Sequence, residues 1–154
     1  MDPAGAIRPL DPRVSIEVRV LNRGEEDVLA NVAPAVFDND IDPVLARDFL
    51  RDQHHHIAVA IDNGVVVAFA SGVDYIHPDK ARELFVNEVG TAPTHRGQGL
   101  AKAVLSALLD RARAAGCTLA WVLTDSDNGA ARALYASTGG KELKLDTVHI
   151  EFDL

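Results

Sequence analysis

The residues best suited to bind a ligand form the run His95-Arg96-Gly97-Gln98-Gly99-Leu100-Ala101-Lys102. The run follows an apolar, strand-like segment, residues 84–91, and opens a helical one in which apolar side chains recur every fourth residue. Glycines at such a strand-to-helix turn leave backbone N–H groups uncovered, at the positive end of the following helix. The run therefore predicts a site for the oxygens of a phosphate-bearing ligand.

Three phosphate-binding patterns compete for this run. The nucleoside-triphosphate loop is excluded, because the glycines lie two positions apart and neither Ser nor Thr follows Lys102. A dinucleotide fingerprint is weakened because Lys102 stands where a small residue is required, but it stays open since Asp125 ends the next strand-like segment. The third pattern is the spacing of Arg96, Gly99 and Ala101.

A second segment follows at a compatible distance. Residues 128–135 are Asn-Gly-Ala-Ala-Arg-Ala-Leu-Tyr, and Gly139 comes after them. This segment resembles the helix Asn-x-x-Ala-x-x-Leu-Tyr-x-x-x-Gly of the GCN5-related N-acetyltransferase (GNAT) superfamily, and the arginine-glycine-alanine spacing resembles its pyrophosphate loop. The resemblance runs from about Ile57 to the C-terminus. Gly140 departs from it, because the family usually has an aromatic or aliphatic residue there.

Some segments look closer to one group within the superfamily. The segments that are similar to the aminoglycoside 3-N-acetyltransferases are Tyr75-Ile76-His77-Pro78, Glu88, His95-Arg96, Ala133-Leu134-Tyr135 and the ending Phe152-Asp153. The resemblance implies an α/β (mixed α+β) GNAT fold, in which roughly six to seven strands form a central, mixed, mostly antiparallel sheet flanked by about four helices.

The resemblance also implies acetyl-coenzyme A (acetyl-CoA) as co-substrate, and we expect no metal. The backbone of Val89–Thr91 would pair with the pantetheine arm, and the pyrophosphate would lie on Gly97–Lys102. The residues expected to bind the coenzyme are Val89, Gly90, Thr91, Arg96, Gly97, Gln98, Gly99, Leu100, Ala101, Lys102, Asn128, Ala131 and Tyr135.

Two residues are expected to be catalytic. Tyr135 is assigned as the general acid, because a phenol with a pKa of about 10 matches the thiolate that leaves; packing of its ring on the helix is the alternative. Glu88 stands just before the strand segment that contacts the coenzyme, on one face of the sheet. Its carboxylate is expected to act as the base or to bind the substrate ammonium, and pairing with Arg82 is the alternative to both.

The acidic residues favour a cationic acceptor. The formal net charge of −8 argues against nucleic acid and suits a small cationic amine, although an acidic surface also serves solubility alone. An aminoglycoside or a polyamine has the ammonium groups that carboxylates pair with. The carboxylates expected around the acceptor belong to Asp38, Asp40, Asp74, Asp125 and Asp153.

Two metal-like patterns do not support a metal site. His54, His55 and His56 enter a strand, so their side chains point to alternate faces and cannot converge. Asp125-x-Asp127-x-Gly129 begins like a calcium loop but lacks the glutamate that closes one.

Length and composition place these residues in one domain. A flexible tail over residues 1–12 is expected before a single N-acetyltransferase domain over residues 13–154. No apolar run reaches the roughly 18 residues of a membrane span, so we expect no membrane partner. Residues 1–12 lack a basic region followed by an apolar core, so we expect no signal peptide. The single cysteine, Cys117, suits a reducing cytoplasm. A homodimer is what the resemblance implies.

Hydrophobic periodicity predicts the order of elements. Strands are expected over residues 14–21, 56–61, 65–75, 84–91 and 118–124, with a final pair that ends at Phe152. Helices are expected over residues 23–35 and 43–53, from Leu100 and from Asn128. Asp42 and Asp127 are the expected N-caps of the second and the last helix, and Asn63-Gly64 is the expected hairpin turn.

The leading hypothesis is an acetyl-CoA-dependent N-acetyltransferase. It would transfer the acetyl group to the primary amine of a small molecule, with an aminoglycoside as one candidate, by direct attack in a ternary complex. Three alternatives stay open: a CoA-binding regulatory or sensor module without turnover, an N-acetyltransferase for a protein or peptide amine, and a dinucleotide-binding protein.

Overall fold

The computed structural model describes residues 16–154, so the tail expected over residues 1–12 lies outside the described residues. The chain forms two compact units, one that ends at Leu123 and a second over Thr124–Leu154. The assignment of residues 13–154 to one domain stays a prediction. No helix in the described part of the chain has the length and apolar character needed to cross a bilayer.

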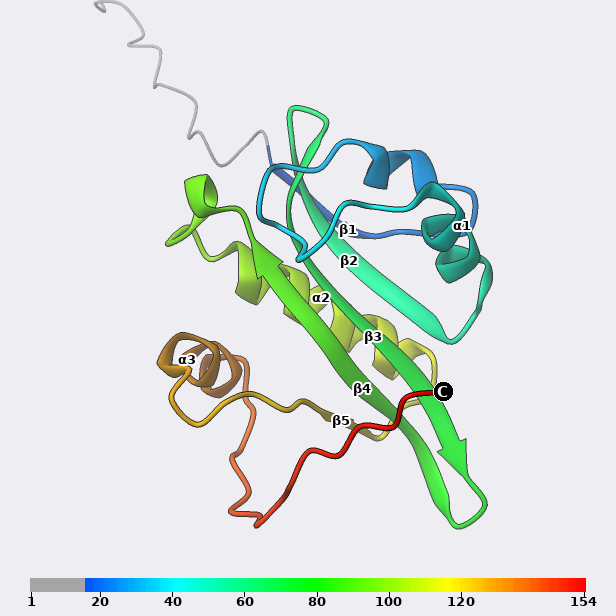
Figure 1. Cartoon of the computed structure of the whole chain (residues 1–154), viewed down its shortest axis with the longest axis vertical. Helices are drawn as coiled ribbons and strands as arrows, with labels where there is room; N and C mark the ends of the chain where they lie inside the picture. The colour runs from blue at the N-terminus through cyan, green and yellow to red at the C-terminus, as the bar shows by residue number, and fades with distance from the viewer. Residues whose placement is uncertain (1–15) are drawn as a thin grey trace, which may run out of the picture. The chain divides into compact units, whose positions relative to one another are not determined.

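A five-stranded mixed sheet forms the centre of the first unit (Figure 1). The strands lie in chain order, and neighbours pair antiparallel except for the last two, which are parallel. They are β1 (Ile16–Val20), β2 (His55–Asp62), β3 (Val65–His77), β4 (Lys80–Thr91) and β5 (Leu119–Trp121). The mixed α/β class is confirmed, with fewer strands than the six to seven expected.

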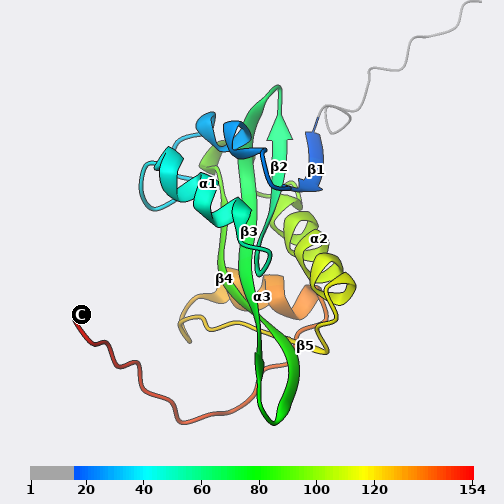
Figure 2. The ribbon, with the colours of Figure 1, turned by 90° about the vertical axis from the view of Figure 1, so that its right-hand side faces the viewer.

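Helices cover both faces of this sheet (Figure 2). On one face, α2 (Leu100–Ala114) packs against β2 and β3 through Val104 and Leu108, which are completely buried. On the other face lie α1 (Pro43–Arg51) and the 3₁₀ helix η2 (Glu26–Ala30). Asp42 is the N-cap of α1, as predicted, and its carboxylate accepts a hydrogen bond from the Val44 amide at 2.8 Å.

The β2–β3 hairpin holds the core. Its turn has φ angles of 50° at Asn63 and 81° at Gly64, the left-handed conformation that this pair favours. Residues 58–60 and 66–70 on its two strands are at most 2% exposed. The hairpin is therefore a rigid support for β4, which pairs with β3 along most of its length.

The helix predicted over residues 23–35 is wrong beyond Ala30. After η2 the chain pairs with the sheet instead: the Ala33 amide donates to the Val66 carbonyl, and the Val66 amide donates to the Asn31 carbonyl, each at 2.9 Å. An α-helix would need those backbone groups for its own hydrogen bonds, so the two arrangements exclude each other. The segment between η2 and α1 is consequently a loop across the sheet.

The second unit contains α3 (Gly129–Ser137) and no strand among its described residues. The N-cap of α3 is Asn128 rather than Asp127, since the Asn128 side chain accepts a hydrogen bond from the Ala131 amide at 3.0 Å. The final pair of strands is a wrong prediction, because residues 141–154 have no regular structure. Their apolar side chains alternate, but a strand also needs a neighbour to pair with, and this unit provides none.

Candidate active site

One edge of β4 is open for most of its second half. β5 pairs with β4 only at Glu83–Phe85, and beyond this the described chain places no strand on that side. The Ala92 amide donates to the Val67 carbonyl at 2.8 Å, toward β3. Because successive backbone groups alternate between the two edges, the amides and carbonyls of Val89 and Thr91 face the open edge. They are available to an extended ligand.

The open edge leads directly into the glycine-rich run. After the 3₁₀ helix η3 (Pro93–His95), Gly97 and Gly99 take φ angles of 75° and 76°, which side chains disfavour. A Cβ on either glycine would meet nothing within 4 Å, so their surface is clear. Gly99 is also the N-cap of α2 and supplies no side-chain cap to the first-turn amides. Arg96 and Lys102 are exposed beside them.

The run is tied to the β2–β3 turn. The His95 Nε2 atom lies 2.8 Å from a carboxylate oxygen of Asp62, and its Nδ1 atom lies 2.8 Å from the Thr94 hydroxyl. The residues from Val89 to Lys102 that are predicted to bind the coenzyme therefore form one continuous segment, which the contact between His95 and Asp62 holds against the end of β2.

A β-bulge orients Glu88. Ser71 pairs with Glu88 while Gly72 pairs with Val86, so Asn87 is an extra residue in β4. Cross-strand partners share a face, which places Glu88 with Ser71 on the side of η2 and α1. Burial and the nearby Asp38 carboxylate raise the pKa of Glu88. Glu88 is thus a half-buried carboxylate with elevated basicity on the face of the sheet that η2 and α1 cover.

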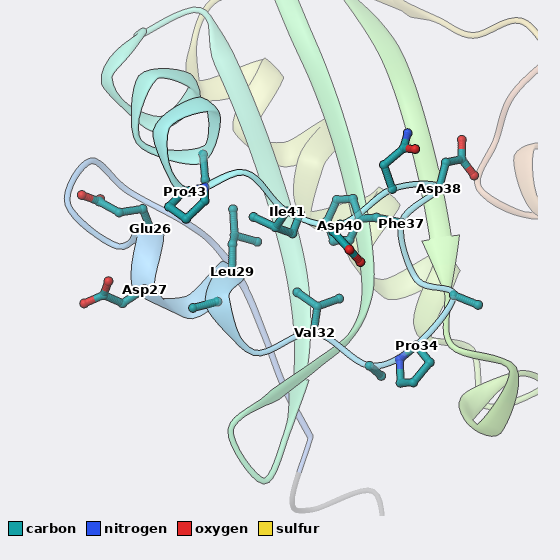
Figure 3. Close-up of a pocket in the computed structure, with 15 residues that line it drawn as sticks. Glu26, Asp27, Leu29, Val32, Pro34, Phe37, Asp38, Asp40, Ile41 and Pro43 are labelled. Carbon is teal, nitrogen blue, oxygen red and sulfur yellow. The ribbon is translucent and has the colours of Figure 1, made fainter.

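An acidic hollow of about 980 Å³ lies on the same side of the sheet (Figure 3). Glu26 and Asp27 border it from η2, and Asp38 and Asp40 border it from the loop before α1. Its lining residues, all within the described part of the chain, include no lysine, arginine or histidine. Leu29, Phe37 and Ile41 contribute an apolar floor. The hollow is suited to a cation with an apolar body.

Sequence reasoning identified Asp38 and Asp40 but missed Glu26 and Asp27. Both lie in the helix that the sequence predicts over residues 23–35, where acidic residues in the first turn interact favourably with the helix dipole. The signal that was available is the spacing of two acidic pairs around an apolar stretch without basic residues, residues 28–37.

Asp74 does not line the hollow, which corrects its assignment to the acceptor site. It is 3% exposed, and β3 places it with Gly72 on the opposite face of the sheet from Ser71. Although burial alone would raise the pKa of Asp74, hydrogen bonds with His56, His54 and Arg82 lower it. The Oδ2 atom lies 2.5 Å from His56 Nε2, and Oδ1 contacts His54 Nδ1 at 2.8 Å and Arg82.

This cluster also bears on the alternative pairing of Glu88 with Arg82 and on the directions of the three consecutive histidines. Arg82 is the partner of Asp74 and lies on the face opposite Glu88, so the pairing of Glu88 with Arg82 is excluded. His54 and His56 converge on a carboxylate, whereas the ring of His55 stacks on Phe49 of α1 with centroids 5.0 Å apart.

The second unit carries the remaining predicted residues. Tyr135 on α3 is half-buried, and burial raises the pKa of its phenol. Asn128 and Ala131 form the helix cap described above, and Asp125 and Asp153 are exposed. Gly140 donates its amide to the Tyr135 carbonyl at 2.8 Å, and a Cβ on Gly140 would lie 2.9 Å from that oxygen. A larger residue at this position would have to displace the Tyr135 backbone carbonyl.

The sequence matches the model of the Acetyltransferase (GNAT) family over residues 26–139, more than half of the chain. The protein therefore belongs to the GNAT family and is an N-acetyltransferase, a type of acyltransferase.

Individual relatives share this assignment. The N-alpha-acetyltransferase RimI of Mycobacterium tuberculosis (strain ATCC 25618 / H37Rv) is 27% identical over 132 residues, which cover 84% of this chain and 81% of RimI. The L-2,4-diaminobutyric acid acetyltransferase of Nocardia farcinica (strain IFM 10152) is 34% identical over 87 residues, 56% of this chain and 44% of that enzyme.

A solved structure shows the same fold. The aminoglycoside N-acetyltransferase AAC(6')-Iy, in complex with the bisubstrate analog CoA-S-monomethyl-acetylneamine, aligns with a TM-score of 0.72 at 18% identity. The alignment covers 90% of this chain and 99% of that chain.

Proposed function

We propose that the protein transfers the acetyl group of acetyl-CoA to the primary amine of a small cationic molecule, by direct attack in a ternary complex. One observation carries this proposal: the open edge of β4 runs into the glycine-rich run, while Glu88 on the same strand lies on the face of the sheet that carries the acidic hollow. Donor and acceptor would meet on this strand.

The residues present fit the coenzyme. The backbone groups of Val89 and Thr91 at the open edge match the amides of a pantetheine arm, and the clear surface of Gly97 and Gly99 leaves room for pyrophosphate oxygens. Arg96 and Lys102 would add positive charge, and Asn128 and Ala131 of the second unit remain predicted coenzyme-binding residues. When bound, acetyl-CoA supplies a thioester, an acyl group activated toward amines.

Glu88 and Tyr135 are proposed to move the protons. A carboxylate with a raised pKa is a stronger base, so Glu88 would take the proton that the attacking nitrogen loses. Tyr135 would give its phenolic proton to the sulfur as the C–S bond breaks, and its raised pKa keeps that proton in place until then.

The hollow supports a small cationic acceptor, with an aminoglycoside or a diamine as the class to test first. Four carboxylates without a basic residue among them would pair with ammonium groups. The amine of a peptide N-terminus is the second candidate, because the likeness to RimI covers most of both chains.

Release of the CoA thiol, followed with a thiol reagent, tests the reaction against aminoglycosides, diamines, amino acids and peptides. The proposal expects acetyl-CoA turnover with at least one cationic small amine, and thermal stabilisation by CoA but not by NAD. Preference for peptides would move the assignment to the second candidate. Absence of CoA binding in calorimetry would overturn the donor and the reaction together.

A further inference from the structure

An exposed aromatic cluster lies on the first unit next to the proposed acceptor side. Trp121, the only tryptophan of the chain, is 38% exposed, and its ring packs against Phe85 with centroids 4.6 Å apart. The indole N–H donates to the Tyr75 hydroxyl at 2.6 Å, and that hydroxyl donates to the Glu83 carboxylate at 3.1 Å. The polar atoms of the cluster are satisfied within it, so the indole plane is fixed.

The cluster shares a face of the sheet with Glu88. On β3, Ser71, Val73 and Tyr75 alternate onto one face, and their partners on β4 are Glu88, Phe85 and Glu83. On β5, Trp121 pairs with Phe85. Without the bulge at Asn87, Phe85 and Glu88 would point to opposite faces, so the bulge makes the aromatic cluster and the carboxylate neighbours.

The distance between Glu88 and the aromatic cluster suits a molecule whose ring carries an amine. Val73 and Ser71 are two residues apart on β3, so their partners Phe85 and Glu88 lie about 7 Å apart along the sheet, and Trp121 lies one strand spacing of about 4.8 Å to the side of Phe85. A six-membered ring whose exocyclic ammonium pairs with the Glu88 carboxylate would bridge most of this gap. An ammonium at Glu88 would place the body of such a molecule over Trp121.

We propose that Trp121, held by Phe85 and Tyr75, is a stacking platform for the ring of an amine acceptor whose amino group reaches Glu88. The acceptor class is thereby narrowed to amines borne on a ring, such as an aminosugar or a cyclohexylamine. The inference rests on the proposed function for the role of Glu88. Flat apolar ring faces stack on indole, and a nearby cation strengthens the contact.

Tryptophan fluorescence tests the platform without requiring turnover, because all emission excited near 295 nm comes from Trp121. The probes are a matched pair, cyclohexylamine and n-hexylamine, together with glucosamine and neamine. If Trp121 stacks on the acceptor ring, its emission should change saturably with the ring-bearing amines and should not change with n-hexylamine. If no ring-bearing amine changes the emission, the platform is overturned, whether or not acetyl transfer is observed.

Kinetics with three variants test specificity. Trp121→Ala is expected to lower the ratio of kcat/KM for cyclohexylamine over n-hexylamine by roughly tenfold, mainly through KM, while Trp121→Phe keeps most of the ratio. Leu119→Ala is the matched control, since Leu119 is 54% exposed on the same strand and face, farther from Glu88. An equal change in the ratio for Leu119→Ala and Trp121→Ala would refute the platform.

Two other outcomes are also decisive. A blue shift of the emission that grows with protein concentration, without amine, would show that a second copy covers Trp121 and would refute the proposal. Fluorescence responses to ring-bearing amines without any acetyl transfer would support the platform and overturn the proposed function instead.

Discussion

Gly90 offers the sharpest test of how the loop between η2 and α1, which carries Asp38 and Asp40 of the acidic hollow, is held. Its position on β4 faces the loop between η2 and α1, and a Cβ built there would collide with the backbone carbonyl of Val36 and lie 2.8 Å from the ring of Phe69. The ring of Phe37 stacks on Phe69 with centroids 3.8 Å apart, which fixes the loop above Gly90. Gly90→Ala must therefore displace the loop backbone rather than a flexible side chain.

The expected cost is that of overpacking, about 1–3 kcal/mol of unfolding free energy. For a chain of this size it corresponds to a fall of roughly 3–9 °C in the unfolding midpoint. Because the displaced loop carries Asp38, the KM of the amine should rise. The Cβ points away from the open edge of β4, so the affinity for CoA should change less than about twofold.

Urea unfolding, amine kinetics and CoA calorimetry measure the three quantities. Gly129→Ala is the control, because a Cβ at Gly129 meets nothing within 4 Å and the residue begins α3, where alanine is at least as good a helix former. If Gly90→Ala unfolds with the same free energy as the wild-type protein, the loop does not rest on Gly90 and the geometry of the acceptor side is refuted.

Four further substitutions have defined outcomes. Because the pKa of Glu88 is raised in the folded protein, the contribution of its carboxyl group to stability is full below the unfolded-state pKa and is lost as pH rises through the folded-state pKa. In urea unfolding, Glu88→Gln should therefore have a larger free energy of unfolding than the wild-type protein around pH 7 and an equal one in acid. Asp74→Asn should cost about 3 kcal/mol near neutral pH, and urea unfolding should show that cost shrinking as pH falls through the lowered pKa of Asp74. Gly99→Ala should lower the free energy of unfolding by about 1–2 kcal/mol, because alanine is strained at the positive φ of this position, and calorimetry should show weaker CoA binding. Tyr135→Phe should lower kcat at least about tenfold with little change in CoA affinity, and an unchanged kcat would remove the general-acid assignment.

Features that depend on a few adjacent residues could be predicted from the sequence. The turn at Asn63-Gly64, the cap at Asp42 and the glycine-rich run before α2 each follow from the conformations that those residue types favour. The fold class itself is inferred from the resemblance of residues 96–101 and 128–139 to the GNAT superfamily, and the same glycine-rich run marks the segment that is proposed to hold the coenzyme.

Features that depend on residues far apart in the chain could not be predicted from the sequence. The chain near Ala33 leaves the helical path because it meets Val66 across the sheet, and no local pattern encodes that meeting. Asp74 looks like any acidic residue beside a loop until His54, His56 and Arg82 surround it. The extra residue at Asn87 appears only once the register of β3 and β4 is known.

That extra residue means that strand length, as well as residue type, determines what the acceptor meets. Removing Asn87 would close the bulge and leave Ser71 opposite Glu88 and Gly72 opposite Val86, so Glu88 and Phe85 would remain on the same face of the sheet. A deletion scan along β4 should therefore find its smallest loss of activity at Asn87, because a deletion elsewhere in the strand leaves the bulge in place and turns part of the strand to the opposite face.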